Sequence, residues 1–235
     1  MNIKLKLDNI NAIAPYAMAF TNFSRVVYPA RPELIIKPEH LWEYEGKNFI
    51  AQPKLNGSNV LVYLDANNQQ VLERHGKAKT GQLPDFKMLH RGNGAMILNG
   101  EWMEKSKKDE TGQNFNGNFI IFDILAYNGY ILGGSTFLNR LLMLHTLYKG
   151  AMHVTEQGKL LAANEFLTAT AYPGIFLINS YYEGFTTLYN KLILIDMYEG
   201  LVLKQKTTML QPPFSLTANT AGQAKSRKPT KSYNS

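Results

Sequence analysis

The sequence of 235 residues contains no cysteine. This absence excludes disulfide bonds, metal sites built on thiolates, and enzymes that use a cysteine nucleophile. Any metal ion would therefore have to bind to oxygen atoms or to imidazole nitrogens. A zinc site is not expected either, because the spacing typical of metal ligands is missing from His40, His90, His145 and His153.

Long apolar runs are also missing from the sequence. The first twenty residues include some apolar side chains, but Asp8, several asparagines and Pro15 interrupt them, which fits neither a signal peptide nor a membrane anchor. We therefore expect a cytoplasmic protein that has no membrane partner. The composition is that of an ordinary globular protein, with 45% hydrophobic residues, and the length suits one main α/β domain.

Acidic residues are absent from the last part of the chain. The segment from Leu201 to Ser235 has no acidic residue and six basic ones, Lys204, Lys206, Lys225, Arg227, Lys228 and Lys231. Of the formal net charge of +7, this segment supplies +6, which leaves about +1 for the first 200 residues. The excess charge can meet phosphate groups. A solvated basic tail is the alternative interpretation.

Short apolar runs that alternate with turn residues predict a β-rich body between Phe49 and Leu125. The expected strands are Phe49–Gln52, Val60–Leu64, Val71–Arg74, Met96–Met103 and Phe119–Leu125. Further strands are expected at Ile175–Ser180 and Gly200–Gln205. The spacing of apolar residues predicts a helix over Phe137–Lys149 and weaker helices over Asn164–Ala171 and Thr186–Met197. The residues from Thr207 to Thr220 are typical of a loop or linker.

The segment Gln52–Asn59 places Lys54 at the end of an expected strand, three residues before Gly57. Such a lysine can project into a cleft, while the glycine lets the backbone turn away tightly. A lysine amine that attacks phosphorus forms a phosphoramidate. On its own, this spacing more often marks an exposed lysine before a hairpin.

Three further segments follow the lysine element in order: Asn99–Trp102, Phe119–Leu125 and Tyr198–Lys204. Together the four segments resemble the motif series of covalent nucleotidyltransferases, the family of ATP-dependent DNA ligases, RNA ligases and mRNA capping enzymes. Asn56 stands where DNA ligases have aspartate. Lys54, Gly57 and Asn59 are nevertheless similar to the lysine-x-x-glycine-x-asparagine pattern of the RNA ligase 2 branch.

The resemblance implies a role for each matched residue. Lys54 would carry the nucleotide, Asn59 would help to bind it, and Glu101 would accept hydrogen bonds from the ribose hydroxyls. An aromatic side chain would stack on the purine, either Phe122 or, with a shift of three residues, Phe119. The expected catalytic set is Lys54, Glu199 and Lys204.

The remaining matches concern phosphate groups and the metal ion. Arg74 would contact a phosphate or the incoming 5′ end, Glu199 would lie near Mg²⁺ or Mn²⁺, and Lys204 would meet the α-phosphate. The last motif of the family is a basic pair at the α-phosphate. Its best match is Lys225 and Arg227, within the segment Lys225–Lys228, and the alternative pair is Lys204 and Lys206.

The family resemblance also implies a fold and a division of the chain. We expect an α+β nucleotidyltransferase (adenylation) domain over residues 46–235, with two antiparallel β-sheets flanked by helices and an ATP cleft between them. Residues 1–45 would form an N-terminal extension, and the basic segment 207–235 would carry the last motif. No OB-fold of ordinary size is expected in this chain.

The expected function is that of an ATP-dependent polynucleotide ligase, with an RNA ligase favoured. ATP would place AMP on Lys54, and the AMP would then move to a 5′-phosphate, which is joined to a 3′-hydroxyl. The partner would be nucleic acid with such ends, and the protein is expected to be a monomer. The alternatives are a compact DNA ligase, a guanylyltransferase of the capping type, and a ligase-like domain that binds nucleic acid without catalysis.

Overall fold

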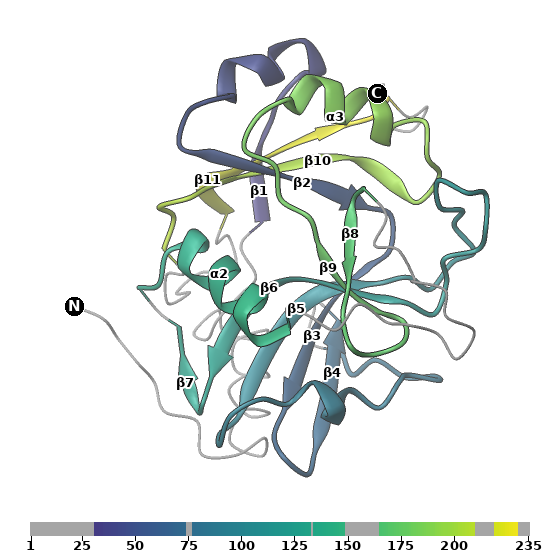
Figure 1. The fold of residues 1–235 in the computed structure, drawn as a ribbon, viewed down its shortest axis with the longest axis vertical. Coiled ribbons are helices and arrows are strands. Elements are labelled where there is room, and N and C mark those ends of the chain that lie inside the picture. The colour runs from purple at the N-terminus through teal and green to yellow at the C-terminus, as the bar shows by residue number, and fades with distance from the viewer. Residues whose placement is uncertain (1–30, 74–76, 133, 149–164, 210–218, 230–235) are drawn as a thin grey trace.

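The computed structural model describes residues 31–73, 77–132, 134–148, 165–209 and 219–229. Their strands form a four-stranded sheet in the order β1-β11-β10-β2 and a seven-stranded sheet in the order β4-β3-β5-β6-β9-β8, in which β7 pairs with β6 (Figure 1). The elements are β1 (Arg31–Ile35), η1 (Pro38–Tyr44), β2 (Phe49–Leu55), β3 (Ser58–Leu64), β4 (Gln69–Glu73), η2 (Phe86–Leu89), β5 (Met96–Trp102), β6 (Phe119–Tyr127), β7 (Tyr130–Ile131), α2 (Phe137–Tyr148), β8 (Leu167–Ala169), β9 (Ile175–Ile178), α3 (Phe185–Leu192), β10 (Tyr198–Gln205) and β11 (Asn219–Arg227).

The small sheet has one apolar face and one polar face, because successive side chains of a strand point to opposite sides. The apolar face packs against η1 and α3 and includes Ala51, Leu55, Leu201, Leu203 and Ala224. Figure 1 shows η1 and α3 above this sheet and the large sheet on its other side. The opposite face, which carries Gln52, Lys54, Lys204, Lys225 and Arg227 by strand alternation and register, is therefore turned toward the large sheet.

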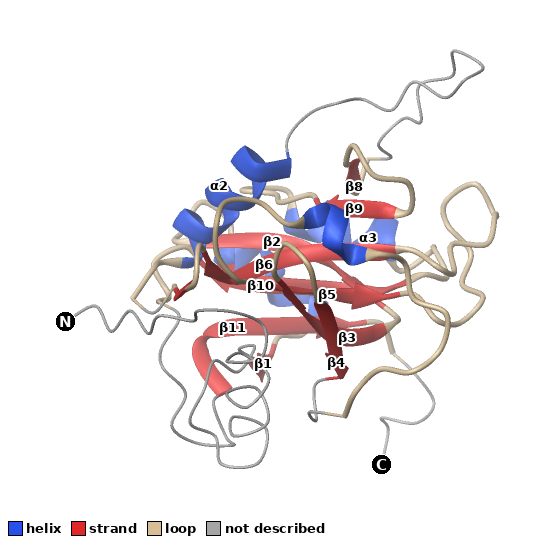
Figure 2. Cartoon of the chain, turned by 90° about the horizontal axis from the view of Figure 1, so that it is seen from below, coloured by secondary structure: helices blue, strands red, loops and turns tan. Residues whose placement is uncertain are grey.

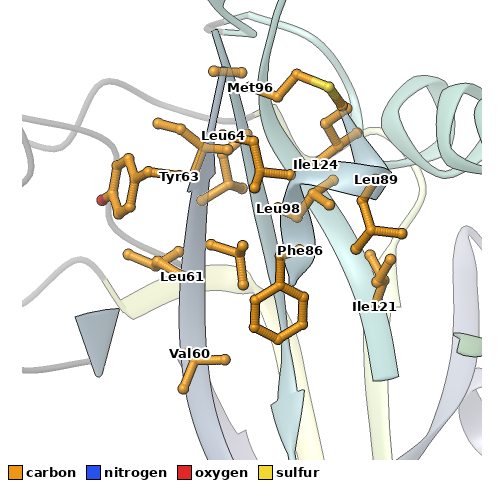
Figure 3. Packing of buried hydrophobic residues seen from close by; sticks show 14 of the residues in the cluster. Val60, Leu61, Tyr63, Leu64, Phe86, Leu89, Met96, Leu98, Ile121 and Ile124 are labelled. Carbon is orange, nitrogen blue, oxygen red and sulfur yellow. The ribbon is translucent and has the colours of Figure 1, made fainter. Parts of the chain in front are cut away.

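The large sheet has its own hydrophobic core. Figure 3 shows Phe86 and Leu89 of the short helix η2 beside Leu98, Ile121 and Ile124, which belong to the same buried cluster. Helix α2 contacts β6, and helix α3 contacts β10 and β2 (Figure 2). The two sheets therefore bring segments that are far apart in the sequence next to one another.

The α+β class is confirmed, but the two sheets are not purely antiparallel. Each sheet contains one parallel pair among its described strands, β1 with β11 in the small sheet and β6 with β9 in the large one. The predicted strands between Phe49 and Leu125 are present, and the predicted helix at Phe137 forms α2. The helix predicted over Thr186–Met197 is shorter, because α3 ends at Leu192.

The helix predicted over Asn164–Ala171 is wrong. Of these residues the structure describes those from position 165 onward, and Leu167–Ala169 forms the edge strand β8, antiparallel to β9. The side chains of Phe166 and Leu167 are buried, and the Thr168 hydroxyl donates to Asn179 Oδ1 at 2.6 Å. Pairing with a strand that lies later in the chain therefore decides the conformation here, as it often does for a short segment of weak propensity.

Part of the expected N-terminal extension packs against the rest of the fold. Strand β1 pairs with β11, and the Glu45 carboxylate accepts hydrogen bonds from the backbone N–H groups of Gly184, at 3.1 Å, and Thr186, at 3.3 Å. Glu45 thereby caps the first turn of α3. The division of the chain at residue 46 stays a prediction. Among the described residues, no helix is both long enough and apolar enough to span a membrane.

Candidate functional site

Lys54 lies near the end of β2, at the point where the chain leaves the small sheet for the large one. Its side chain is 19% exposed. The turn to β3 runs through Gly57, where an added Cβ would lie 2.7 Å from the Trp102 carbonyl oxygen and 2.8 Å from Glu101 Cγ. Only glycine fits this close approach without displacing backbone. The close approach of β5 therefore requires the glycine of this sequence element.

Glu199 is the ion-pair partner of Lys54: Lys54 Nζ donates to Glu199 Oε2. The register of β10 against β2 shifts between Tyr198 and Gly200, and Gly200 lies opposite Lys54. Such a bulge can redirect a side chain, and here the side chain inside it reaches the lysine on the neighbouring strand. Gly200 has φ +136°, and an added Cβ would meet the Ser226 carbonyl oxygen at 2.1 Å, so this position also requires glycine.

Two cations of β11 share the face that carries Lys54. Lys225 lies opposite Val202, and Arg227 lies opposite Gly200. Arg227 Nε lies 3.7 Å from Glu199 Oε2. Burial, together with the positive charges of Arg227 and Lys54, lowers the pKa of Lys225. Lys225 therefore lies within electrostatic range of Arg227 and Lys54, an arrangement that suits the binding of an anion.

Lys204 is buried between two aromatic rings that belong to different elements. Its Nζ lies 4.8 Å from the centroid of Phe122 in β6 and 4.7 Å from that of Phe137 in α2. Burial lowers the pKa of Lys204 to about 8; the nearby Asp123 carboxylate opposes this shift and the Arg140 guanidinium adds to it. Asp123 and Arg140 form a bidentate pair with distances of 2.8 Å and 2.9 Å.

Glu101 and Asn59 lie opposite each other on β5 and β3. The backbone N–H of Gly57 donates to Glu101 Oε1 at 3.1 Å, which ties this carboxylate to the turn that follows Lys54. The Asn59 side-chain oxygen accepts from Asn99 Nδ2 at 3.3 Å. Both residues are therefore held on the large sheet, close to the turn that joins β2 to β3.

The residues of the open alternatives have different surroundings in the structure. Phe119 is fully buried, with its ring 5.0 Å from that of Phe86, in the core of the large sheet, whereas Phe122 contacts Lys204. Lys206 Nζ lies over the ring of Tyr182 at 5.4 Å. Phe122 thus lies beside a cation of the small sheet and Phe119 does not, and Arg227 of the pair Lys225 and Arg227 lies beside Glu199. Arg74 lies outside the described residues.

Other side chains near this site were given no role from the sequence. Phe137 contacts Lys204, and Gln52, only 2% exposed, stands two residues before Lys54 and donates to Ser180 Oγ at 3.0 Å. Because side chains alternate along a strand, a residue two positions before Lys54 lies on the same face, so a polar residue there is a signal that the sequence offers. No local pattern points to Phe137, because its partner Lys204 is far away in the sequence.

Glu199 is the carboxylate beside Lys54, and its possible metal chemistry follows from that position. In the described part of the chain, no group of three or more histidine, aspartate or glutamate residues could hold a metal ion by itself. A single carboxylate does suit Mg²⁺, which often binds through one or two carboxylates together with the phosphates of a substrate. The residues present therefore fit a metal ion that arrives with a nucleotide.

No family model matches the sequence, and no curated protein matches it. Similar solved structures do exist. They include a mycobacterial DNA ligase D complexed with ATP and MES (TM-score 0.55, 17% identity, 90% of this chain and 62% of that chain), the ligase domain of LigD from M. tuberculosis (TM-score 0.56, 18% identity, 88% and 61%), and a Lig E DNA ligase (TM-score 0.52, 13% identity, 86% and 70%). This chain spans about three-fifths of the length of the first two.

Proposed function

We propose that this chain, which has the nucleotidyltransferase fold of ATP-dependent ligases, is an ATP-dependent polynucleotide ligase that forms a covalent lysyl-AMP at Lys54. The observation that carries the proposal is the position of Lys54. It contacts Glu199 and lies on the same face of the small sheet as Lys204, Lys225 and Arg227. A lysine amine and three further cations from distant segments therefore share one face of the small sheet, and a carboxylate lies beside the amine.

In the first reaction, Lys54 leaves Glu199, gives its ammonium proton to solvent water and attacks the α-phosphorus of ATP as the neutral amine. A nitrogen–phosphorus bond forms, and the bond from the α-phosphorus to the bridging oxygen breaks. Pyrophosphate departs with the electron pair of that bond. Lys204, Lys225 and Arg227 stabilise the negative charge on the phosphoryl oxygens during this exchange.

The other matched residues would bind the rest of the nucleotide. Phe122 would stack on the purine, Glu101 would accept hydrogen bonds from the ribose hydroxyls, and Asn59, beside Glu101, would complete this side of the site. Glu199 would hold Mg²⁺ or Mn²⁺, which supplies positive charge at the phosphates. Arg74 would receive the 5′-phosphate to which AMP is passed before a 3′-hydroxyl displaces the AMP.

RNA is the substrate that we propose, on the basis of the pattern formed by Lys54, Gly57 and Asn59. The competing candidate is a compact DNA ligase, which is favoured by the similar solved structures, since these are DNA ligases. RNA differs from DNA by the 2′-hydroxyl group of each sugar, which lets a protein distinguish the two substrates.

Matched nicked duplexes test the substrate preference. We expect a nick with RNA on its 3′-hydroxyl side to be sealed at least roughly tenfold faster than the same nick in DNA, an effect of about 1.4 kcal/mol. The measurement is the initial rate of joining with equal sequences, and Lys54→Arg serves as the inactive control. Equal or faster sealing of DNA would instead favour the DNA ligase.

A further inference from the structure

Asn56 lies between two charged side chains that come from distant parts of the chain. With its amide nitrogen directed at Glu199, Asn56 donates to Glu199 Oε1 at 3.2 Å and accepts from Lys107 Nζ at 3.3 Å. The backbone N–H of Asn56 donates to the Met197 carbonyl oxygen at 2.9 Å. The residue is therefore fixed through both its backbone and its side chain.

Lys107 is held in turn by Asp196. Lys107 Nζ donates to Asp196 Oδ1 at 3.0 Å, and the backbone N–H of Lys108 donates to Asp196 Oδ2 at 3.2 Å. Burial acts to raise the pKa of Asp196, but these hydrogen bonds and the positive charges of Lys107 and Lys228 lower it. The carboxylate thus stays charged and anchors the lysine, and the Lys107 charge then fixes which way the Asn56 amide points.

The two oxygens of Glu199 have separate partners. Oε2 faces Lys54 and Arg227, whereas Oε1 faces the amide of Asn56. When Lys54 turns from the carboxylate to ATP, Oε2 loses its closest partner, but the hydrogen bond at Oε1 remains. A carboxylate that keeps a hydrogen bond at one oxygen stays better oriented than a carboxylate that has lost its partners at both oxygens.

We propose that Asn56 is a positioning residue, which keeps Glu199 in place during adenylation while Lys107 and Asp196 orient its amide. This inference rests on the proposed function. An aspartate at position 56 would put a second carboxylate about 3.2 Å from Glu199 Oε1 and about 3.3 Å from Lys107 Nζ.

Single-turnover adenylation of the full chain with labelled ATP tests the proposal. We expect Asn56→Asp to lower the rate constant roughly 10- to 100-fold and Lys107→Met roughly 3- to 10-fold, with the apparent affinity for ATP little changed. The double variant should lose more than the product of the two effects, because the new carboxylate then lacks its cation. Lys108→Met removes the same charge from the adjacent, exposed residue and should act like wild type.

Rate constants for Asn56→Asp and Lys107→Met equal to that of Lys108→Met would overturn the proposal, and so would a loss confined to ATP affinity. Thermal unfolding shows which variants fold. If Asn56→Asp does not fold, Lys107→Arg decides, because it should recover most of the rate that Lys107→Met loses, and equal losses in both would contradict the positioning role.

A wild-type chain that forms no adduct would contradict the proposed function itself. The contact between Asn56 and Glu199 can then be measured separately. A double-mutant cycle of Asn56→Ala and Glu199→Ala, followed by denaturant unfolding without ATP, should show a favourable coupling, and additive effects would overturn the positioning role.

Discussion

Replacing Lys204 by methionine is expected to lower the rate of Lys54 adenylation by roughly 10²- to 10³-fold and, at the same time, to stabilise the fold. The rate should fall because the variant lacks a preorganised cation at the reacting phosphate. The gain in stability follows from burial: an ammonium whose pKa falls from 10.5 to about 8 is costly to bury in its charged form. At about 1.36 kcal/mol per pKa unit, offset by the lost contacts to two rings, we expect an increase of about 1 to 3 kcal/mol in the free energy of unfolding near neutral pH.

The control for this prediction is Lys206→Met, two residues further along, where Lys206 Nζ lies over Tyr182. This variant removes the same charge and should leave the adenylation rate within about threefold of wild type, as expected for a residue outside the site. Single-turnover labelling and denaturant unfolding give the two quantities. A Lys204→Met protein that is both active and less stable would show that Lys204 only supports the fold.

The pKa of Lys204 also predicts a pH dependence. Above about pH 8 Lys204 loses its proton, so its contribution to the rate should disappear. The ratio of the wild-type rate to that of Lys204→Arg cancels the ionisation of other groups and should fall as the pH rises past about 8, because arginine stays charged. A ratio that stays constant up to about pH 10 would contradict the assignment.

The same pKa fixes the sign of the stability change with pH. The folded-state pKa lies below the unfolded value of 10.5, so between about pH 8 and 10.5 the unfolded chain binds more protons at Lys204. The cost of the buried ammonium is therefore fully present below about pH 8 and fades as the pH rises toward 10.5. The stability gained by Lys204→Met should shrink across this window, which denaturant unfolding at several pH values can check.

Much of the fold could be predicted from local patterns, because the strands between Phe49 and Leu125 and the helix at Phe137 have clear periodicity. The segment Leu167–Ala169 shows the limit. It is too short for its own pattern to decide, and its pairing with β9 makes it a strand. The pairing of β1 with β11 is equally invisible to local analysis, because it joins segments about 190 residues apart.

The candidate site residues that belong to motifs could be proposed from the order of those motifs in the sequence. The order of Lys54, Glu101, Phe122, Glu199 and Lys204 along the sequence selects them as candidates, and the structure places Lys54 beside Glu199 and Lys204 beside Phe122. The contact between Lys54 and Glu199 depends on a register shift in β10, which no spacing in the sequence reveals.

The supporting contacts were not predictable. Asn56, Lys107 and Asp196 come from the β2–β3 turn, the loop between β5 and β6, and the residues after α3. Taken singly they are ordinary polar residues. Only in the folded protein do they form a series of contacts that ends at Glu199.

Lys54→Arg is expected to abolish covalent labelling while leaving the fold intact. Arginine preserves the positive charge beside Glu199, but its guanidinium stays protonated and does not act as a nucleophile. The protein should unfold at nearly the same temperature as wild type and form no adduct. An arginine variant that is labelled as strongly as wild type would place the nucleotide on another residue.

The roles proposed for the other residues depend on Lys54 Nζ being the atom that receives the adenylyl group. The most direct measurement incubates the chain with α-labelled ATP and Mg²⁺, digests it and maps the modified peptide by mass spectrometry. We predict a single AMP, attached through an acid-labile nitrogen–phosphorus bond to Lys54 and lost in Lys54→Arg. A folded wild-type protein that binds ATP but carries no AMP, or carries it elsewhere, would contradict this account.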